Sequence, residues 1–224
     1  MRDVEHHPPA IADHPWKRFV AIGDSITEGY GMDPVDGVEH LPWVERVARA
    51  LAAGRPDFEH HNLGRRNLPA AAVRDTQLDR ALELKPDLVS IAAGPNDMIS
   101  SEFDRDALER DMEPIYAAFA DTGAFVFTFT YMDFPNTGLL PEEGAAFIRE
   151  RMELLHDAVL ALADRYGALV IDLYSDPRTA NPDFFSEDLK HANALGQAYV
   201  AEQTLNALAR ALEAGRARDR AASG

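Results

Sequence analysis

The sequence predicts an α/β fold, a three-layer α/β/α sandwich around a five-stranded parallel sheet of the flavodoxin-like kind. Five runs of apolar, β-branched or aromatic residues recur along the chain, and segments with apolar residues at helical spacing separate them. Such an alternation of strand and helix is typical of a parallel sheet with helices on both faces and right-handed crossovers. We therefore expect the functional loops at the edge where the carboxyl ends of the strands lie.

The strands are expected at residues 19–22, 58–63, 88–93, 124–130 and 168–173. The first run has no polar side chain, as in a strand buried on both faces of a sheet. The second is the weakest because it contains two histidines.

The helices are expected near residues 43–51, 71–84, 108–120, 147–166 and 194–214. Gly54 and Gly167 follow two of them, where glycine favours the end of a helix. The longest irregular stretch, residues 131–144, contains two prolines and two glycines, and we expect it to form a lid or a binding loop.

The chain of 224 residues predicts one domain with ample material for a core. We expect residues 1–16 to form an N-terminal arm, 17–214 the single domain, and 215–224 a disordered basic tail.

The composition excludes some classes of partner and chemistry. Because the sequence has no cysteine, disulfides and thiol chemistry are excluded. The formal net charge of −16 repels polyanions, so neither nucleic acid nor an anionic membrane is an expected partner. The N-terminus lacks the apolar core of a signal peptide and no segment is long enough to span a bilayer, so we expect a cytoplasmic protein. The sequence does not indicate the oligomeric state.

Polar residues follow the strands where functional loops are expected. Ser25 ends the block Gly23-Asp24-Ser25 after the first strand, and Gly94-Pro95-Asn96-Asp97 follows the third. Asp188 and His191 come after the fifth, three residues apart. A Gly-Asp-Ser triplet alone more often caps a helix. A hydroxyl, an amide and an acid–histidine pair at one edge of a sheet are, however, the groups that acyl transfer requires.

These three blocks resemble the motifs of the SGNH, or GDSL-like, hydrolase family of esterases and lipases in type, order and spacing. The resemblance covers nearly the whole chain and implies the SGNH hydrolase fold and the hydrolysis of carboxylic esters of small molecules. It implies that Ser25 is the nucleophile, His191 the base and Asp188 the residue that orients the imidazole. It also implies an oxyanion hole formed by the Ser25 backbone N–H, the Asn96 side chain and a backbone N–H of the loop after the second strand.

The sequence departs from the family pattern in that loop. Asn67 stands where the family has the glycine of the oxyanion hole, and Gly64 comes earlier in the turn. Asparagine tolerates left-handed backbone better than most residues, so its N–H can still be oriented correctly. The Asn67 side chain would also narrow the pocket or donate a hydrogen bond of its own. An alternative role for Asn67 is to cap the helix that follows. Ile26 replaces the leucine of the first block, a conservative change.

We assign substrate binding to five residues close to these blocks: Asp24, Gly64, Met98, Phe134 and Phe185. Other apolar candidates for the pocket are Tyr30, Met32, Ile99, Met132 and Phe184. The alternatives are that the aromatic side chains pack in the core and that Asp24 and Asp97 brace loops. Arg65 and Arg66 either meet an anionic substrate group or are solvated.

No cofactor is expected, because neither a Gly-x-Gly-x-x-Gly nor a P-loop follows the first strand. A metal site built on Asp188 and His191 lacks the His-x-x-x-His or cysteine pairs typical of zinc. Two alternatives stay open: a non-catalytic binding protein of the same fold, and a thioesterase or acyltransferase that uses the same residues.

Overall fold

The computed structural model of the chain describes residue 11 and residues 13–222. Its centre is a five-stranded sheet in the order β2-β1-β3-β4-β5, and every neighbouring pair is parallel. The predicted α/β fold with a five-stranded parallel sheet is thereby confirmed. The strands are β1 (Arg18–Gly23), β2 (Glu59–Asn62), β3 (Leu88–Ala92), β4 (Phe125–Phe129) and β5 (Leu169–Ile171).

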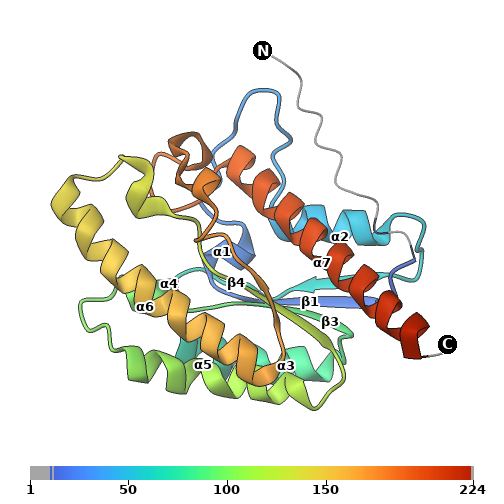
Figure 1. Ribbon diagram of the computed structural model, residues 1–224. Coiled ribbons are helices and arrows are strands. Elements are labelled where there is room, and N and C mark those ends of the chain that lie inside the picture. Colours follow the sequence, from blue (N-terminus) through green and yellow to red (C-terminus); the bar gives the residue numbers. More distant parts are fainter. Residues whose placement is uncertain (1–10, 12, 223–224) are drawn as a thin grey trace.

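Helices cover both faces of the sheet (Figure 1). One face carries α2 (Trp43–Ala52) and α7 (Ala194–Ala222), and the other carries α3 (Ala70–Glu83), α5 (Arg105–Ala120) and α6 (Glu142–Tyr166). Five short helices follow the strands: α1 (Ser25–Glu28), α4 (Pro95–Met98), η1 (Phe134–Thr137), η2 (Pro177–Ala180) and η3 (Pro182–Phe184).

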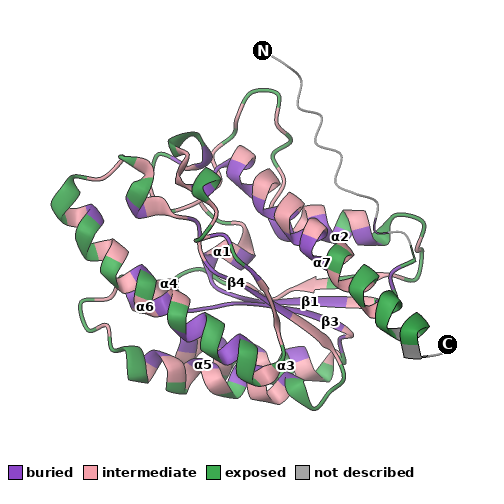
Figure 2. Cartoon of the chain, in the orientation of Figure 1, coloured by how far each residue is buried: buried purple, intermediate pink, exposed green. Residues whose placement is uncertain are grey.

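The alternation of side chains along β1 divides the core in two. Phe19 and Ala21 pack with α2 and α7, whereas Val20 and Ile22 pack with α3, α5 and α6. All four are fully buried, and the central strands are coloured as buried in Figure 2. The strand that leads to Ser25 is therefore held from both faces and along both edges.

Strand β2 is the exposed edge of the sheet, which explains its weak sequence pattern. Glu59 and His60 are exposed, and His60 pairs with Glu45 at 2.8 Å. An edge strand needs fewer apolar residues because water covers one of its sides.

The two ends of the chain differ from the sequence prediction. Helix α7 continues to Ala222, past Gly215, so residues 215–222 are helical where a disordered tail was predicted. The alanines and arginines after Gly215 are strong helix formers that offset the cost of one glycine, about 1 kcal/mol. Residues 1–10, 12, 223 and 224 lie outside the described residues. The remainder of the predicted arm packs on the core, with Ile11 and Trp16 buried.

No helix within the described residues combines the length and the apolar character needed to cross a membrane.

Candidate active site

Ser25 lies at a tight turn between β1 and α1. Gly23 has φ of 153°, and a Cβ there would lie 2.2 Å from the Ala92 carbonyl oxygen, so the turn requires glycine. The Gly23 N–H donates to Gln77 Oε1, and Gln77 Nε2 donates to the Gly23 carbonyl, both at 2.8 Å. Asp24 caps α1 by accepting a hydrogen bond from the Ile26 N–H. These contacts fix the backbone that carries Ser25.

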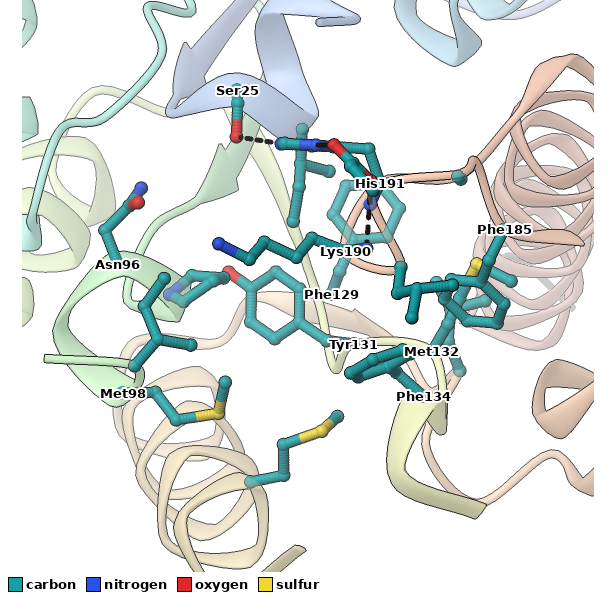
Figure 3. Close-up of a pocket in the computed structure, with 18 of the residues that line it drawn as sticks. Ser25, Asn96, Met98, Phe129, Tyr131, Met132, Phe134, Phe185, Lys190 and His191 are labelled. Carbon is teal, nitrogen blue, oxygen red and sulfur yellow. Dashed lines mark hydrogen bonds and ion pairs between the residues drawn. The ribbon is translucent and has the colours of Figure 1, made fainter. Parts of the chain in front are cut away.

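Ser25, His191 and Asp188 form a continuous chain of hydrogen bonds (Figure 3). Ser25 Oγ lies 2.9 Å from His191 Nε2, and His191 Nδ1 lies 2.5 Å from Asp188 Oδ2. Asp188 Oδ1 also accepts the backbone N–H groups of Lys190 and His191 at 3.0 Å. Burial opposes the charge of Asp188, but these hydrogen bonds outweigh it and lower the pKa of that carboxyl. The structure thus brings together the three residues that the sequence assigned to catalysis.

The turn from Ser186 to His191 presents the histidine. Ser186 N–H donates to the His191 carbonyl, and the Leu189 N–H donates to the Ser186 carbonyl. Leu189 adopts a left-handed conformation with φ of 57°. Asp33 ties the turn to the loop after α1, because its carboxylate accepts the Glu187 N–H at 2.7 Å.

Residues after α1 enclose the His191 ring. A Cβ on Gly31 would lie 2.6 Å from His191 Nδ1, so only glycine leaves room for the ring. Tyr30 contacts the imidazole in a T-shaped arrangement with centroids 5.5 Å apart. The guanidinium of Arg66 stacks 3.8 Å from the Tyr30 centroid and pairs with Glu28 at 2.6 Å. Arg66 is therefore neither free nor merely solvated.

The loop after β2 brings Asn67 to the cavity beside Ser25. Asn67 has φ of 63°, the left-handed backbone expected for a residue in place of glycine. Among the described residues, nothing accepts a hydrogen bond from the backbone N–H of Ser25 or of Asn67. Both groups are therefore available to a ligand.

Asn96 lines the same cavity, but both hydrogens of its side-chain amide are engaged. Asn96 Nδ2 donates to Asp24 Oδ2 and to the Leu68 carbonyl, each at 3.1 Å. In this arrangement the Asn96 amide bridges the loop after β1, which carries Asp24, and the loop after β2, which carries Leu68. Neither of its hydrogens is donated to Ser25 Oγ.

Asp24 and Gly64, which the sequence assigned to substrate binding, do not line the cavity. Asp24 is fully buried below Ser25, and burial raises its pKa to about 7. Asp97 close by has a pKa raised by burial as well, and it accepts the Ala70 N–H at 2.8 Å. Gly64 is instead needed for packing, because a Cβ there would lie 2.5 Å from the Glu28 nitrogen.

An apolar cavity of about 420 Å³ opens beside Ser25 at the ends of β3 and β4. Met98, Phe134 and Phe185 line it, as predicted, and so do the candidates Ile99 and Met132. Tyr30, Met32 and Phe184 do not line it; Tyr30 instead packs on His191, and Phe184 stacks on Tyr199.

Sequence reasoning missed much of the cavity wall. Trp43 and Val200 come from α2 and α7, while Ile148, Met152 and Leu155 come from α6. Their spacing indicated helices with a core-facing stripe, and nothing in that pattern distinguishes a core position from a cavity wall. Lys190 was missed as well, although it stands between Asp188 and His191.

The fold and the site together define an SGNH-type hydrolase. The profile of the GDSL-like Lipase/Acylhydrolase family matches residues 21–199. The chain belongs to this family, and it is an ester-hydrolysing enzyme.

Solved structures of esterases and lipases share the fold. One is LAE5, an alpha/beta hydrolase enzyme from the metagenome of Lake Arreo, with 24% identity and a TM-score of 0.68 over 85% of this chain and 94% of that chain. The lipase/acylhydrolase of Enterococcus faecalis has 21% identity and a TM-score of 0.65 over 86% and 95%. The psychrotrophic esterase EstA of Pseudoalteromonas sp. has 16% identity and a TM-score of 0.67 over 88% and 99%. No curated protein sequence matches the chain.

Proposed function

We propose that the chain hydrolyses carboxylic esters of small molecules through an acyl-enzyme on Ser25. The observation that carries this proposal is the hydrogen-bonded chain from Ser25 through His191 to Asp188, with the serine at the wall of an apolar cavity. His191 takes the proton of Ser25 Oγ as that oxygen attacks the ester carbonyl, and returns it to the leaving alcohol. Asp188 holds the imidazole through Nδ1 and stabilises the imidazolium. Water activated by His191 then cleaves the acyl-enzyme.

The free N–H groups of Ser25 and Asn67 supply two donors for the oxyanion. Asn96 becomes a third when the substrate oxygen replaces the Leu68 carbonyl as an acceptor of its amide. One donor of this kind contributes about 3–4 kcal/mol to transition-state stabilisation in comparable sites.

The cavity supports a small ester with an apolar acyl or alcohol group. Its walls are largely aliphatic, aromatic and thioether side chains, and its volume of about 420 Å³ is in the range of small-molecule sites. Thioester hydrolysis or transfer of the acyl group to an alcohol would use the same residues. Hydrolysis is the better-supported reaction, because the matching family is one of lipases and acylhydrolases.

The test compares wild type, Ser25→Ala and Ser101→Ala on 4-nitrophenyl esters from acetate to octanoate. Loss of the nucleophile is expected to lower kcat/KM by at least about 10³-fold. The exposed Ser101, which lies outside the cavity, serves as the matched serine control. A fluorophosphonate probe should label wild type and Ser101→Ala but not Ser25→Ala. Full activity in Ser25→Ala would refute the mechanism, and so would a wild type that the fluorophosphonate probe does not label.

A further inference from the structure

The cavity beside Ser25 contains one unexplained charge. Within the part of the chain that the structure describes, Lys190 is the only lysine or arginine that lines this cavity. Its side chain extends from the turn that carries His191 into the cavity, toward the side on which Asn96 lies (Figure 3). Asp188, the carboxylate that also lines the cavity, is engaged with His191.

The direction of the Lys190 side chain is determined by the turn around Asp188 and His191 and not by an ion pair. The Lys190 N–H donates to Asp188 Oδ1, and the neighbouring residues Leu189 and His191 are held by hydrogen bonds within the turn. No acidic side chain among the described residues pairs with the Lys190 ammonium, and no hydrogen bond uses it. By contrast, arginines elsewhere on this acidic chain, such as Arg49 and Arg66, pair with glutamates.

An unpaired ammonium beside apolar walls is suited to bind an anion. Lysine offers three donors and a compact charge, which carboxylates and phosphates accept. Lys190 as a whole residue is exposed, so water screens such a pair in part and its contribution to binding is modest. The overall charge of the protein repels anions, since the formal net charge is −16.

We infer that Lys190 selects ester substrates that carry a carboxylate or phosphate group near the scissile bond. This inference rests on the proposed function and narrows its substrate class. The anion belongs either to the acyl part, as in a monoester of a dicarboxylic acid, or to the alcohol part, as in an ester of a phosphorylated alcohol.

The experiment compares anionic esters with neutral esters of matched length. Mono-4-nitrophenyl adipate against 4-nitrophenyl hexanoate tests the acyl side, and 2-phosphoethyl butyrate against pentyl butyrate tests the alcohol side. The readout is the ratio of kcat/KM for the anionic ester to that for the neutral ester. Wild type is compared with Lys190→Met, Lys190→Arg and Lys17→Met. Lys17 is an exposed lysine just before β1, at the opposite edge of the sheet, so its substitution matches the change in net charge.

Lys190→Met is expected to lower the ratio roughly three- to tenfold for one of the two pairs, through KM rather than kcat. Lys190→Arg should retain most of the preference, and Lys17→Met all of it. The pair that responds identifies the side of the ester that carries the anion. An equal ratio in wild type and Lys190→Met for both pairs would overturn the inference.

A binding measurement separates this inference from the proposed mechanism. Trp43 lines the cavity, so its fluorescence can follow the binding of monomethyl adipate and of methyl hexanoate to Ser25→Ala. The anion should bind Ser25→Ala more tightly than it binds the double variant Ser25→Ala/Lys190→Met, whether or not the wild type turns over esters. Equal binding by the two proteins would contradict the role of Lys190, while inactivity of the wild type toward all esters would contradict only the proposed reaction.

Discussion

Two residues at the cavity occupy backbone conformations that usually belong to glycine. Asn67 and Leu189 have φ of 63° and 57°, and both line the cavity. Asparagine accepts this conformation readily, whereas for leucine it costs about 1–2 kcal/mol. The hydrogen bonds of the turn around Asp188 and His191 maintain the conformation of Leu189. Asn67 therefore has the left-handed backbone typical of a glycine, and, unlike a glycine, it has a side chain at the cavity.

The buried carboxyl of Asp24 makes the stability of the protein depend on pH. Burial raises its pKa to about 7 in the folded state, against an ordinary value of 3.8. Between these values the folded state holds a proton that the unfolded state has lost, so the unfolding free energy falls as pH rises from about 4 to about 7. Above about pH 7 Asp24 is deprotonated in both the folded and the unfolded state, so its titration no longer changes the unfolding free energy.

Asp24→Asn should remove this dependence. The difference between its unfolding free energy and that of wild type is expected to grow by roughly 1–2 kcal/mol from pH 5 to pH 7, in favour of the variant. Above pH 7 this difference should level off. Urea denaturation at pH 5, 6, 7 and 8 measures the difference. Asp121→Asn, at an exposed position after α5, is the matched control. A difference that is constant with pH would show that Asp24 titrates normally.

At the level of elements, the position of Ser25 depends on a contact between α3 and the end of β1. Gln77 of α3 is 4% exposed and makes hydrogen bonds to both backbone groups of Gly23. The Gly23 carbonyl also accepts the Arg65 N–H, but the Gly23 N–H depends on Gln77. The Gln77 side chain thus forms hydrogen bonds with both backbone groups of Gly23, at the turn that presents Ser25.

Gln77→Leu is expected to lower the unfolding free energy by about 2–3 kcal/mol, because it leaves the buried Gly23 N–H without an acceptor. Urea denaturation checks this value. Thr76→Val, its exposed neighbour on α3, should change stability by no more than about 0.5 kcal/mol. Similar effects of the two substitutions would mean that the contact between Gln77 and Gly23 contributes little.

At the level of the whole molecule, the excess of acidic residues acts against the compact state. The sequence has 38 Asp and Glu against 22 Lys and Arg, so we expect repulsion to outweigh the attraction in surface ion pairs. Such repulsion between exposed charges is screened by salt, whose Debye length falls from about 30 Å at 0.01 M to about 8 Å at 0.15 M.

Raising NaCl from 0.01 to 0.15 M should therefore increase the urea midpoint of unfolding. Tetramethylammonium chloride at the same ionic strength should produce a similar increase, since screening does not depend on the identity of the cation. A midpoint that falls with salt would mean that attractive pairs, such as Arg49–Glu39, dominate the surface.

The sequence by itself determined the order of the elements, the parallel sheet and the blocks that carry Ser25, Asn96, Asp188 and His191. Each of these depends on local patterns: runs of buried residues, helical spacing, and polar residues where a strand ends. The same kind of local pattern misjudged α7, because a single glycine signals an end only when its neighbours are weak helix formers.

Only the tertiary structure decided which side chains surround Ser25. The cavity wall combines Trp43, Met152 and Val200 from three helices far apart in sequence. Asp24 is buried beside Asn96, which comes from the loop after another strand. The direction of Lys190 likewise depends on the turn in which Asp188 accepts the backbone N–H groups of Lys190 and His191. These features arise from contacts between segments that are far apart in sequence. The periodicity of one segment does not indicate which other segment will pack against it.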